Sequence, residues 1–350
     1  MANKKLPSRG AASNPVNRYE KLAVAWEDEY AEGERLRPTE YFRDASRSVL
    51  AENSSPDVPF RFSLNPYRGC EHGCVYCYAR PTHEYLGFSA GLDFEQRIMV
   101  KEDAPALLRA TFSSPRWQPE VVALSGNTDC YQPIERHLRI TRRCLEVFAE
   151  FRNPVGVVTK STLVLRDLDL LQDLARDNLV RVAISITTLD GNLARRLEPR
   201  AAQPQKRLEA VAALASAGVQ VAVMAAPVIP GLNDEEIPRI LAAAREVGAM
   251  GASYVLLRLP RPVDRLFADW LREHFPERVR RVLGRVRECR QGKLYSSEFD
   301  QRKTGTGPYA DHVAELFRVT ARRLGLDRPL PPLNTGAFRR PQRDRQLSLL

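Results

Sequence analysis

Short runs of apolar and β-branched residues recur along the middle of the chain, and turn-forming or charged residues bound each of them. This pattern predicts buried β-strands. The strands are expected at residues 61–67, 120–125, 154–160, 179–186, 219–229 and 252–259. Between them, apolar residues recur every three or four positions, which predicts amphipathic helices. These helices are expected at residues 134–151, 161–176, 204–218 and 234–248, and Gly218 and Gly248 stand where two of them would end.

The alternation of strand and helix predicts an α/β fold with a parallel sheet and helices outside it. The periodicity is equally compatible with an open sheet and with a barrel, but in both the ligands bind at the carboxyl ends of the strands. After residue 260 the pattern is helical, at 260–275, 276–289 and 309–325. Residues 1–60 are polar and weakly periodic, which predicts a partly ordered arm. The predicted parts are an N-terminal arm (1–60), a core (61–260) and a helical C-terminal extension (261–350).

The composition of the chain limits where it is expected to act. No stretch of the 350 residues approaches the roughly 20 consecutive apolar positions of a membrane-spanning helix, and the first residues lack the apolar segment of a secretory signal. We therefore expect a cytoplasmic protein with no membrane partner. In that reducing compartment, closely spaced cysteines are more often metal ligands or catalytic thiols than disulfides.

The chain is basic, with a formal net charge of +10, and arginine-rich clusters lie at 277–290 and 338–345. Such clusters attract nucleic acid or other polyanions. Acidic residues are interspersed among them, and a solvated helix face has the same pattern. The pattern alone leaves both interpretations open.

Three of the six cysteines lie within the eight residues CEHGCVYC, as Cys70, Cys74 and Cys77. The motif directly follows the first predicted strand, so it occupies a loop at the ligand-binding end of the sheet. A structural zinc site requires four protein ligands, whereas three thiolates on a four-iron cluster leave one iron with an open coordination position. The alternatives are zinc with His72 as the fourth ligand, and cysteines that only pack.

The motif resembles the Cys-x3-Cys-x2-Cys signature of the radical S-adenosylmethionine (radical SAM) enzymes, including the aromatic residue before the last cysteine, here Tyr76. More narrowly, NPYRGCEHGCVYCYARPTHEY and NTDCYQPIE are similar to an uncharacterised bacterial branch related to spore photoproduct lyase, often described as DNA-repair-photolyase-like. The resemblance implies a partial (β/α)6 TIM-like barrel and a 4Fe–4S cluster whose open iron binds S-adenosylmethionine (SAM). An electron from a donor such as flavodoxin or ferredoxin would cleave SAM to a 5′-deoxyadenosyl radical, which abstracts a hydrogen from the substrate.

The resemblance also assigns cofactor contacts to residues at the ends of the predicted strands. Thr128 and Asp129, after the second strand, would contact the amino group of SAM. Lys160, after the third, would pair with the SAM carboxylate, and Ser185 in the fourth would reach the ribose or carboxylate. Each residue type also has a structural alternative: an Asx turn or helix cap, a lysine that ends a strand, and a buried serine bonded to backbone.

Further contacts are implied downstream. Glu198 and Arg200 resemble a recurring acid-and-arginine pair that would touch the sugar or carboxylate, although an ordinary surface ion pair looks identical. The surroundings of adenine would come from Val228, Ile229, Asn233 and Leu257, the last through its backbone groups. Apolar residues in a strand are usually core, and only the Pro-Gly interruption after the fifth strand favours function there.

The chain departs from spore photoproduct lyase at the hydrogen-donor cysteine of that enzyme. The aligned position holds Gly126, and Cys130, four residues on, could serve as a catalytic thiol only if the loop turns back. The match therefore does not support activity on spore photoproduct. Cys144 and Cys289 lie on apolar helical faces and are expected to pack. Aromatic residues near the expected barrel mouth would stack on a base or shield the cluster, namely Tyr78, His83, Tyr85 and Tyr131.

The sequence thus predicts a radical SAM enzyme, with nucleic acid as the first expectation for its substrate. A protein or metabolite substrate is the second possibility within the same chemistry. The alternative from another class is a cluster- or zinc-bearing nucleic-acid-binding module without radical chemistry.

Overall fold

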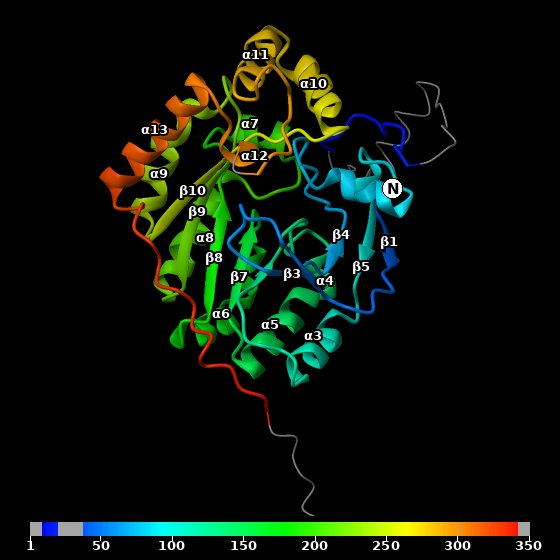
Figure 1. The fold of residues 1–350 in the computed structure, drawn as a ribbon, viewed down its shortest axis with the longest axis vertical. Helices are drawn as coiled ribbons and strands as arrows, with labels where there is room; N and C mark the ends of the chain where they lie inside the picture. Colours follow the sequence, from blue (N-terminus) through cyan, green and yellow to red (C-terminus); the bar gives the residue numbers. More distant parts are fainter. Residues whose placement is uncertain (1–8, 20–37, 300, 342–350) are drawn as a thin grey trace, which may run out of the picture.

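A seven-stranded sheet forms the centre of the computed structural model, which describes residues 9–19, 38–299 and 301–341 (Figure 1). Its strands lie in the spatial order β10 (Gly251–Leu256), β9 (Gln220–Val228), β8 (Val180–Ser185), β7 (Val155–Thr159), β6 (Val122–Leu124), β3 (Phe62–Leu64) and β2 (Leu50–Glu52). Neighbours from β10 to β3 pair in parallel, and β2 pairs antiparallel with β3. The six predicted strands are confirmed. Among the described residues no pairing joins β10 to β2, so the sheet is an open, partial barrel, as the resemblance implies.

Helices that follow the strands pack on the sheet. They are α3 (Ala104–Ser113), α5 (Ile140–Phe151), α6 (Leu168–Arg176), α7 (Gly191–Leu197), α8 (Pro204–Ser216) and α9 (Ile237–Glu246). Alternate residues of β7 are buried because successive side chains of a strand point to opposite faces. One continuous apolar cluster joins strands and helices, with Leu145, Phe148 and Leu171 wholly buried. Gly218 and Gly248 adopt left-handed φ angles of 78° and 99° just after α8 and α9, as predicted.

The single helix predicted at 134–151 was wrong, because the chain forms two helices there. These are α4 (Glu135–Leu138) and α5, separated by Arg139 in a left-handed conformation with φ 52°. The Glu135 carboxylate accepts hydrogen bonds from the amides of Thr141 (3.0 Å) and Arg142 (3.4 Å). It therefore caps the first turn of α5 and makes the break favourable. Two other predicted helices begin as 3-10 turns, η2 (Thr162–Asp167) before α6 and η3 (Asp234–Glu236) before α9.

A second, three-stranded sheet lies beside the barrel (Figure 1). Its order is β1 (Glu40–Arg43), β5 (Arg97–Val100) and β4 (Tyr67–Arg68), and the short helices η1 (Arg80–Leu86) and α2 (Asp93–Gln96) precede β5. The sequence did not predict these elements, because they are too short to show a period. Strands β1 and β2 belong to the predicted arm, of which residues 1–8 and 20–37 lie outside the described residues. The boundaries at residues 60 and 260 stay predictions.

The C-terminal part is helical, as predicted. Its helices are α10 (Val263–His274), η4 (Pro276–Arg278), α11 (Val279–Glu288), α12 (Gln301–Thr304) and α13 (Pro308–Leu324). Helices α10 and α11 lie beyond the carboxyl ends of the strands, and α13 packs against α9 (Figure 1). From α13 the chain runs to the opposite end of the sheet, where the amide of Arg339 donates to the carbonyl of Phe151 (2.9 Å). No helix within the described ranges is long and apolar enough to cross a bilayer.

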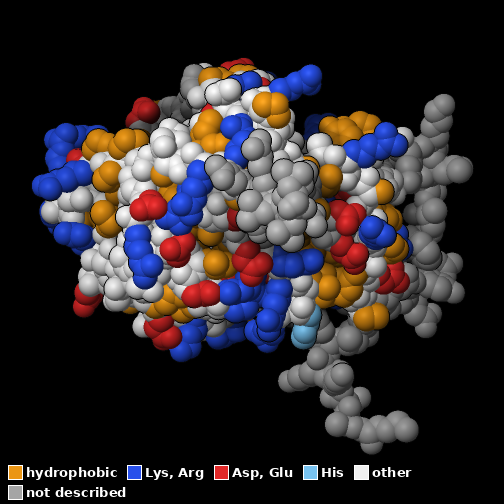
Figure 2. Space-filling view, turned by 90° about the horizontal axis from the view of Figure 1, so that it is seen from below, with side chains coloured by type: hydrophobic (Ala, Val, Ile, Leu, Met, Phe, Trp, Pro, Cys, Tyr) orange, Lys and Arg blue, Asp and Glu red, His pale blue; other side chains and the backbone are white. Residues whose placement is uncertain are grey.

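The face at the amino ends of the strands carries charges of both signs. Basic and acidic side chains are interspersed over it (Figure 2), and Arg152, for example, pairs with Asp173 (2.6 Å). The arginine-rich cluster 338–345 begins near this end, where Arg340 donates to the carbonyls of Ser114 and Trp117, both at 2.9 Å. Arg340 therefore fastens the chain to the core, and residues 342–345 lie outside the described residues.

Candidate active site

The three clustered cysteines occupy a buried loop between β4 and η1. Cys70 and Cys74 are 7% and 8% exposed, and Cys77 is half-buried; all three are free thiols. The amide of Cys70 donates to the carbonyl of Phe94 (2.8 Å), which anchors the start of the loop. Gly73 has a φ of 66°, and a side chain there would meet the Glu95 carboxylate at 2.7 Å. The loop therefore needs glycine at this turn.

A wholly buried ion pair supports this loop from behind. Arg80 and Glu95 are both fully buried, 2.5 Å apart, and the Arg80 guanidinium also donates twice to the Cys74 carbonyl (2.9 and 3.0 Å). The Glu95 carboxylate also accepts the amides of Gly10 (3.0 Å) and Ala11 (2.7 Å). The N-terminal segment of the chain thus packs directly on the cysteine loop.

The donor set fits an iron–sulfur cluster better than a zinc ion. Across the described parts of the chain, no group of three or more His, Cys, Asp or Glu side chains could hold a single metal ion. His72 does not join the cysteines; its Nδ1 lies 3.4 Å from the Asp129 carboxylate. In a 4Fe–4S cluster each thiolate binds a different iron, so the three sulfurs need not converge on one point. Burial raises the pKa of Cys74, so a bound metal has to displace its proton.

Glu198 forms the centre of a polar group beside Cys74. It follows α7, is 1% exposed, and accepts hydrogen bonds from the hydroxyls of Tyr76 and Thr187. Arg207, from α8, pairs with it, and Lys160 Nζ lies 3.8 Å away. Burial raises the pKa of Glu198, but Arg207 and Lys160 outweigh this effect and lower the pKa to about 2. Glu198 is therefore a carboxylate at neutral pH.

Lys160 and Ser185 meet at the ends of neighbouring strands. Lys160 Nζ donates to Ser185 Oγ (2.6 Å), and Ser185 Oγ donates to the carbonyl of Ala226 (2.9 Å). The ammonium group also lies 6.0 Å from the ring of Tyr76. Four residues that the resemblance assigned to the cofactor site, from four separate segments, therefore lie together: Tyr76, Lys160, Ser185 and Glu198.

Asp129 is held next to this group. Its carboxylate accepts the amide of Lys160 (2.8 Å), the hydroxyl of Thr159 (2.7 Å) and the amide of Tyr131 (2.9 Å). The last of these is the Asx turn that the sequence left open as an alternative. Burial raises the pKa of Asp129, but His72 and the hydrogen bonds lower it to about 2.

Thr128 turns away from that carboxylate. Its hydroxyl donates to the carbonyl of Tyr67 (2.8 Å), and its side chain is buried. The backbone amide of Thr128 is bound by the side chain of Asn65 (3.3 Å). Thr128 thus fixes the loop after β6, and Asp129 is the member of the pair that lies beside Lys160.

Glu198 and Arg200 do not pair with each other, which excludes the ordinary ion pair that the sequence left open as the alternative to cofactor contacts. Arg200 instead binds Glu71 (2.9 Å), which is 1% exposed, and Glu198 binds Arg207. The chain turns after α7, so the Arg200 amide bonds to the carbonyl of His72 (3.3 Å) and its side chain reaches Glu71 in the cysteine loop. Neither Arg207 nor Glu71 was predicted from the sequence.

The predicted surroundings of adenine are packed by the protein itself. Val228, Ile229 and Leu257 are all nearly or fully buried. Asn233 accepts the amide of Ile229 (2.6 Å) and donates to the carbonyl of Thr187 (2.7 Å), so it ties the loops after β8 and β9 together. The amide of Leu257 is already bonded to the carbonyl of Val228 (2.9 Å), and its carbonyl oxygen already accepts a bond from Arg290 (3.0 Å), so only the second lone pair of that oxygen is left for adenine.

Cys130 lies in the hydrophobic core. It is 0% exposed and belongs to the same apolar cluster as Tyr67 and Cys144. The loop does not turn back to present its thiol at the mouth, and burial raises the pKa of that thiol. This burial argues against the catalytic role that the sequence left open. Cys144 and Cys289 are buried, as expected of packing thiols.

Of the four aromatic residues expected near the mouth, Tyr78 is exposed there. It follows Cys77, is 42% exposed, and its hydroxyl donates to the carbonyl of Gly126 (2.7 Å). His83 and Tyr131 are fully buried and bonded to the carbonyl of Arg97 (2.9 Å) and to the Asp167 carboxylate (3.0 Å). Tyr85 is exposed and stacks on Tyr19.

The chain is similar to several known proteins. A family model described as the radical SAM superfamily matches residues 64–244. The uncharacterized protein Rv2578c of Mycobacterium tuberculosis is 39% identical over 284 residues, which cover 80% of each chain. A radical SAM Nalpha-GlyT isomerase of Pseudomonas phage M6 is 23% identical over 82% of this chain and 56% of its own. Among solved structures, spore photoproduct lyase complexed with dinucleoside spore photoproduct is similar with a TM-score of 0.54 and 15% identity, over 88% of this chain and 85% of that one.

Proposed function

Because this chain belongs to the radical SAM superfamily, whose enzymes use a 4Fe–4S cluster and SAM, we propose that it catalyses radical chemistry on a nucleic acid. When bound, these cofactors supply a 5′-deoxyadenosyl radical that abstracts a hydrogen from the substrate. The observation that carries the proposal is the meeting of Tyr76, Lys160, Ser185 and Glu198 beside the cysteine loop.

The charges of this group suit the amino-acid end of SAM. The Arg207 guanidinium balances the Glu198 carboxylate, so the Lys160 ammonium is left to pair with one further carboxylate. Asp129 lies beside Lys160 and offers a negative charge for an amino group. The two residues therefore complement the two opposite charges of an amino acid at neutral pH. Cys70, Cys74 and Cys77 hold the cluster.

Several contacts orient these groups. Ser185 holds the Lys160 side chain extended toward the site (2.6 Å), and Asn233 keeps the loops after β8 and β9 in register. Val228 and Ile229 supply apolar surface next to them. Arg200 and Glu71 brace the cysteine loop from outside, so we assign them support of the loop and no contact with SAM.

Nucleic acid is the proposed substrate class for two reasons. Spore photoproduct lyase, which shares this fold, has been solved with a dinucleoside spore photoproduct. In this chain, Arg290 and the α12 side chains Arg302 and Lys303 lie next to the loop after β10, at the carboxyl end of the sheet. We do not propose spore photoproduct itself, because Gly126 stands at the aligned donor position and Cys130 is buried.

We further propose a cytoplasmic location and electron delivery by flavodoxin or ferredoxin. The cysteines in the described residues are all free thiols, which supports a reducing compartment. The competing function, a nucleic-acid-binding module without radical chemistry, gives no reason for the buried Lys160–Glu198 group.

The test is SAM cleavage under anaerobic conditions with dithionite as the reductant. We expect the protein to form 5′-deoxyadenosine slowly alone and faster with single-stranded or duplex oligonucleotides. Formation that no oligonucleotide stimulates would contradict nucleic acid as the substrate. No formation under any condition would contradict radical chemistry.

A further inference from the structure

Arg258 is a half-buried arginine at the mouth of the barrel. It follows β10, and its guanidinium carbon lies 4.8 Å from the centre of the Tyr78 ring. Its Nε is buried and has no hydrogen-bond partner among the described residues. No carboxylate of the described residues forms an ion pair with Arg258. A buried N–H group without a hydrogen-bond partner is unfavourable, so the retention of arginine here calls for a reason.

Arg290, close to Arg258, is a structural arginine and makes a useful comparison. Its guanidinium donates to the backbone carbonyls of Leu257 (3.0 Å), Arg302 (3.0 Å) and Gln301. All of these bonds join the loop after β10 to α12. Within the described ranges Arg258 makes no such bonds, so support of the backbone does not account for it.

The other charges around Arg258 are mostly positive. Lys303 and Arg302, both from α12, bind Asp57, Lys303 through the carbonyl and Arg302 through the carboxylate. Burial lowers the pKa of Lys303, and the positive charges of Arg258 and Arg302 lower it further, against the effect of Asp57. Burial and the charge of Arg258 likewise lower the pKa of Arg290. In the described residues, four cations therefore lie near two carboxylates, Asp57 and Glu298, which leaves an excess of positive charge around Arg258.

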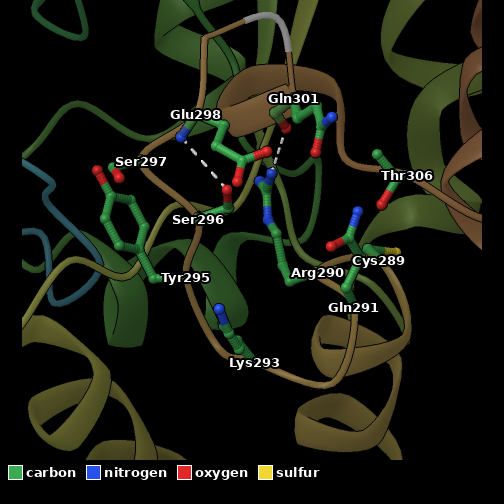
Figure 3. A pocket seen from close by; sticks show the side chains of 10 residues that line it. All are labelled: Cys289, Arg290, Gln291, Lys293, Tyr295, Ser296, Ser297, Glu298, Gln301 and Thr306. Atoms are coloured by element: carbon green, nitrogen blue, oxygen red, sulfur yellow. Dashed lines mark hydrogen bonds between the residues drawn. The ribbon is translucent and has the colours of Figure 1, made fainter.

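A hollow of about 160 Å³ adjoins this group (Figure 3). Its lining includes Arg290 and Lys293, the carboxylate of Glu298, and the hydroxyl residues Tyr295, Ser296 and Ser297. Arg290 also bonds to Leu257, the neighbour of Arg258. The hollow therefore lies next to the loop that carries Arg258.

We propose that Arg258, stacked on Tyr78, binds a phosphate group of the substrate at the barrel mouth. The guanidinium fork matches two phosphate oxygens and stacks on an aromatic ring at the same time. Tyr78 directly follows Cys77, so a phosphate at Arg258 holds the attached nucleoside close to the cluster loop. This inference rests on the proposed function for its nucleic-acid substrate.

The test compares Arg258→Gln with Arg265→Gln, a matched control on the exposed face of α10. Binding of a fluorescent single-stranded oligonucleotide is measured by anisotropy over a range of salt concentrations. We expect Arg258→Gln to weaken binding about tenfold and to reduce the slope of log K against log salt by about 0.7. Arg265→Gln should change the affinity less than about twofold. Arg258→Lys, which keeps the charge but loses the fork, should lie between the wild type and Arg258→Gln.

Two further measurements separate this site from the proposed function. Far-UV circular dichroism and iron content should be equal in wild type and Arg258→Gln, which shows that the variant is folded. Equal affinities and salt slopes for Arg258→Gln and Arg265→Gln would overturn the phosphate site while leaving the radical chemistry intact. If the wild type binds no oligonucleotide, ³¹P NMR line broadening of inorganic phosphate decides: binding lost in Arg258→Gln supports the site, and no binding to wild type overturns it.

Discussion

Lys160 Nζ lies 2.6 Å from Ser185 Oγ, although the two residues are 25 positions apart in the chain. The parallel pairing of β7 with β8 brings them together, since Thr159 is opposite Ile184 in the register. Lys160 directly follows β7 and Ser185 ends β8, on the side where the cysteine loop lies. The contact shows how the barrel brings the ends of separate strands together to form one binding surface.

Replacing Lys160 should weaken SAM binding. We expect Lys160→Met to raise the apparent KM for SAM about tenfold to a hundredfold, because a charge-assisted bond to the SAM carboxylate is lost. The iron content should stay that of the wild type. The measurement is 5′-deoxyadenosine formation against SAM concentration, with Lys206→Met, an exposed lysine paired with Glu209, as the control. An unchanged KM in Lys160→Met would remove this residue from the cofactor site.

Breaking the buried pair of Glu198 and Arg207 should destabilise the protein. Glu198→Gln leaves the buried Arg207 without its counter-charge, which we expect to lower the free energy of unfolding by about 3 kcal/mol. Removing both charges together, in Glu198→Gln with Arg207→Met, should restore part of that loss. Urea unfolding measures both variants. A double variant less stable than Glu198→Gln would show that the pair is not the source of the effect.

The N-terminal segment should protect the cluster. A side chain at Gly10 would collide with the backbone oxygen of Gly73, inside the cysteine loop. We expect Gly10→Ala to lose the absorbance of its cluster several-fold faster than the wild type on exposure to air or to a chelator. Gly284→Ala is the matched control, because a side chain at Gly284 has no described neighbour within 4 Å. Equal rates of loss in the two variants would mean that the contact of Gly10 with Gly73 has no protective effect.

His83 should make the stability of the protein depend on pH. Burial lowers its pKa from the usual 6.5 to about 4. Below pH 6.5 the unfolded chain therefore takes up a proton that the folded chain refuses, so stability falls between pH 6.5 and pH 4, by up to about 3 kcal/mol. We expect His83→Gln to remove this part of the pH dependence in urea unfolding. His137→Gln, at an exposed position, should keep the pH dependence of the wild type. If the stability of His83→Gln depends on pH as that of the wild type does, His83 is not its source.

Cys130→Ala should leave the chemistry in place. The thiol is wholly buried in the core, so its loss should cost about 1 kcal/mol of stability. 5′-Deoxyadenosine formation should stay within about twofold of the wild type, as for Cys144→Ala. Product formation abolished in Cys130→Ala but not in Cys144→Ala would restore the catalytic role.

The main strands could be predicted because each is a short β-branched run that the sheet buries. The break at Arg139 could not, since the apolar period continues through it and the cause is a cap from Glu135. The choice of Glu198 between Arg200 and Arg207 was equally hidden. Both arginines follow Glu198 in the chain, and the direction of the turn after α7 determines which of them pairs with it. Nothing in the sequence distinguishes Arg258 from the rest of the 53 lysines and arginines, because only its neighbours in three dimensions set it apart.

The most direct test is the iron content of anaerobically purified protein, measured together with its EPR spectrum after reduction, in the wild type and in Cys70→Ala, Cys74→Ala and Cys77→Ala. We expect about four iron atoms per wild-type chain, an EPR signal that changes when SAM is added, and loss of both in each variant. Zinc in place of iron, or a cluster whose signal does not respond to SAM, would contradict an open iron held by three cysteines.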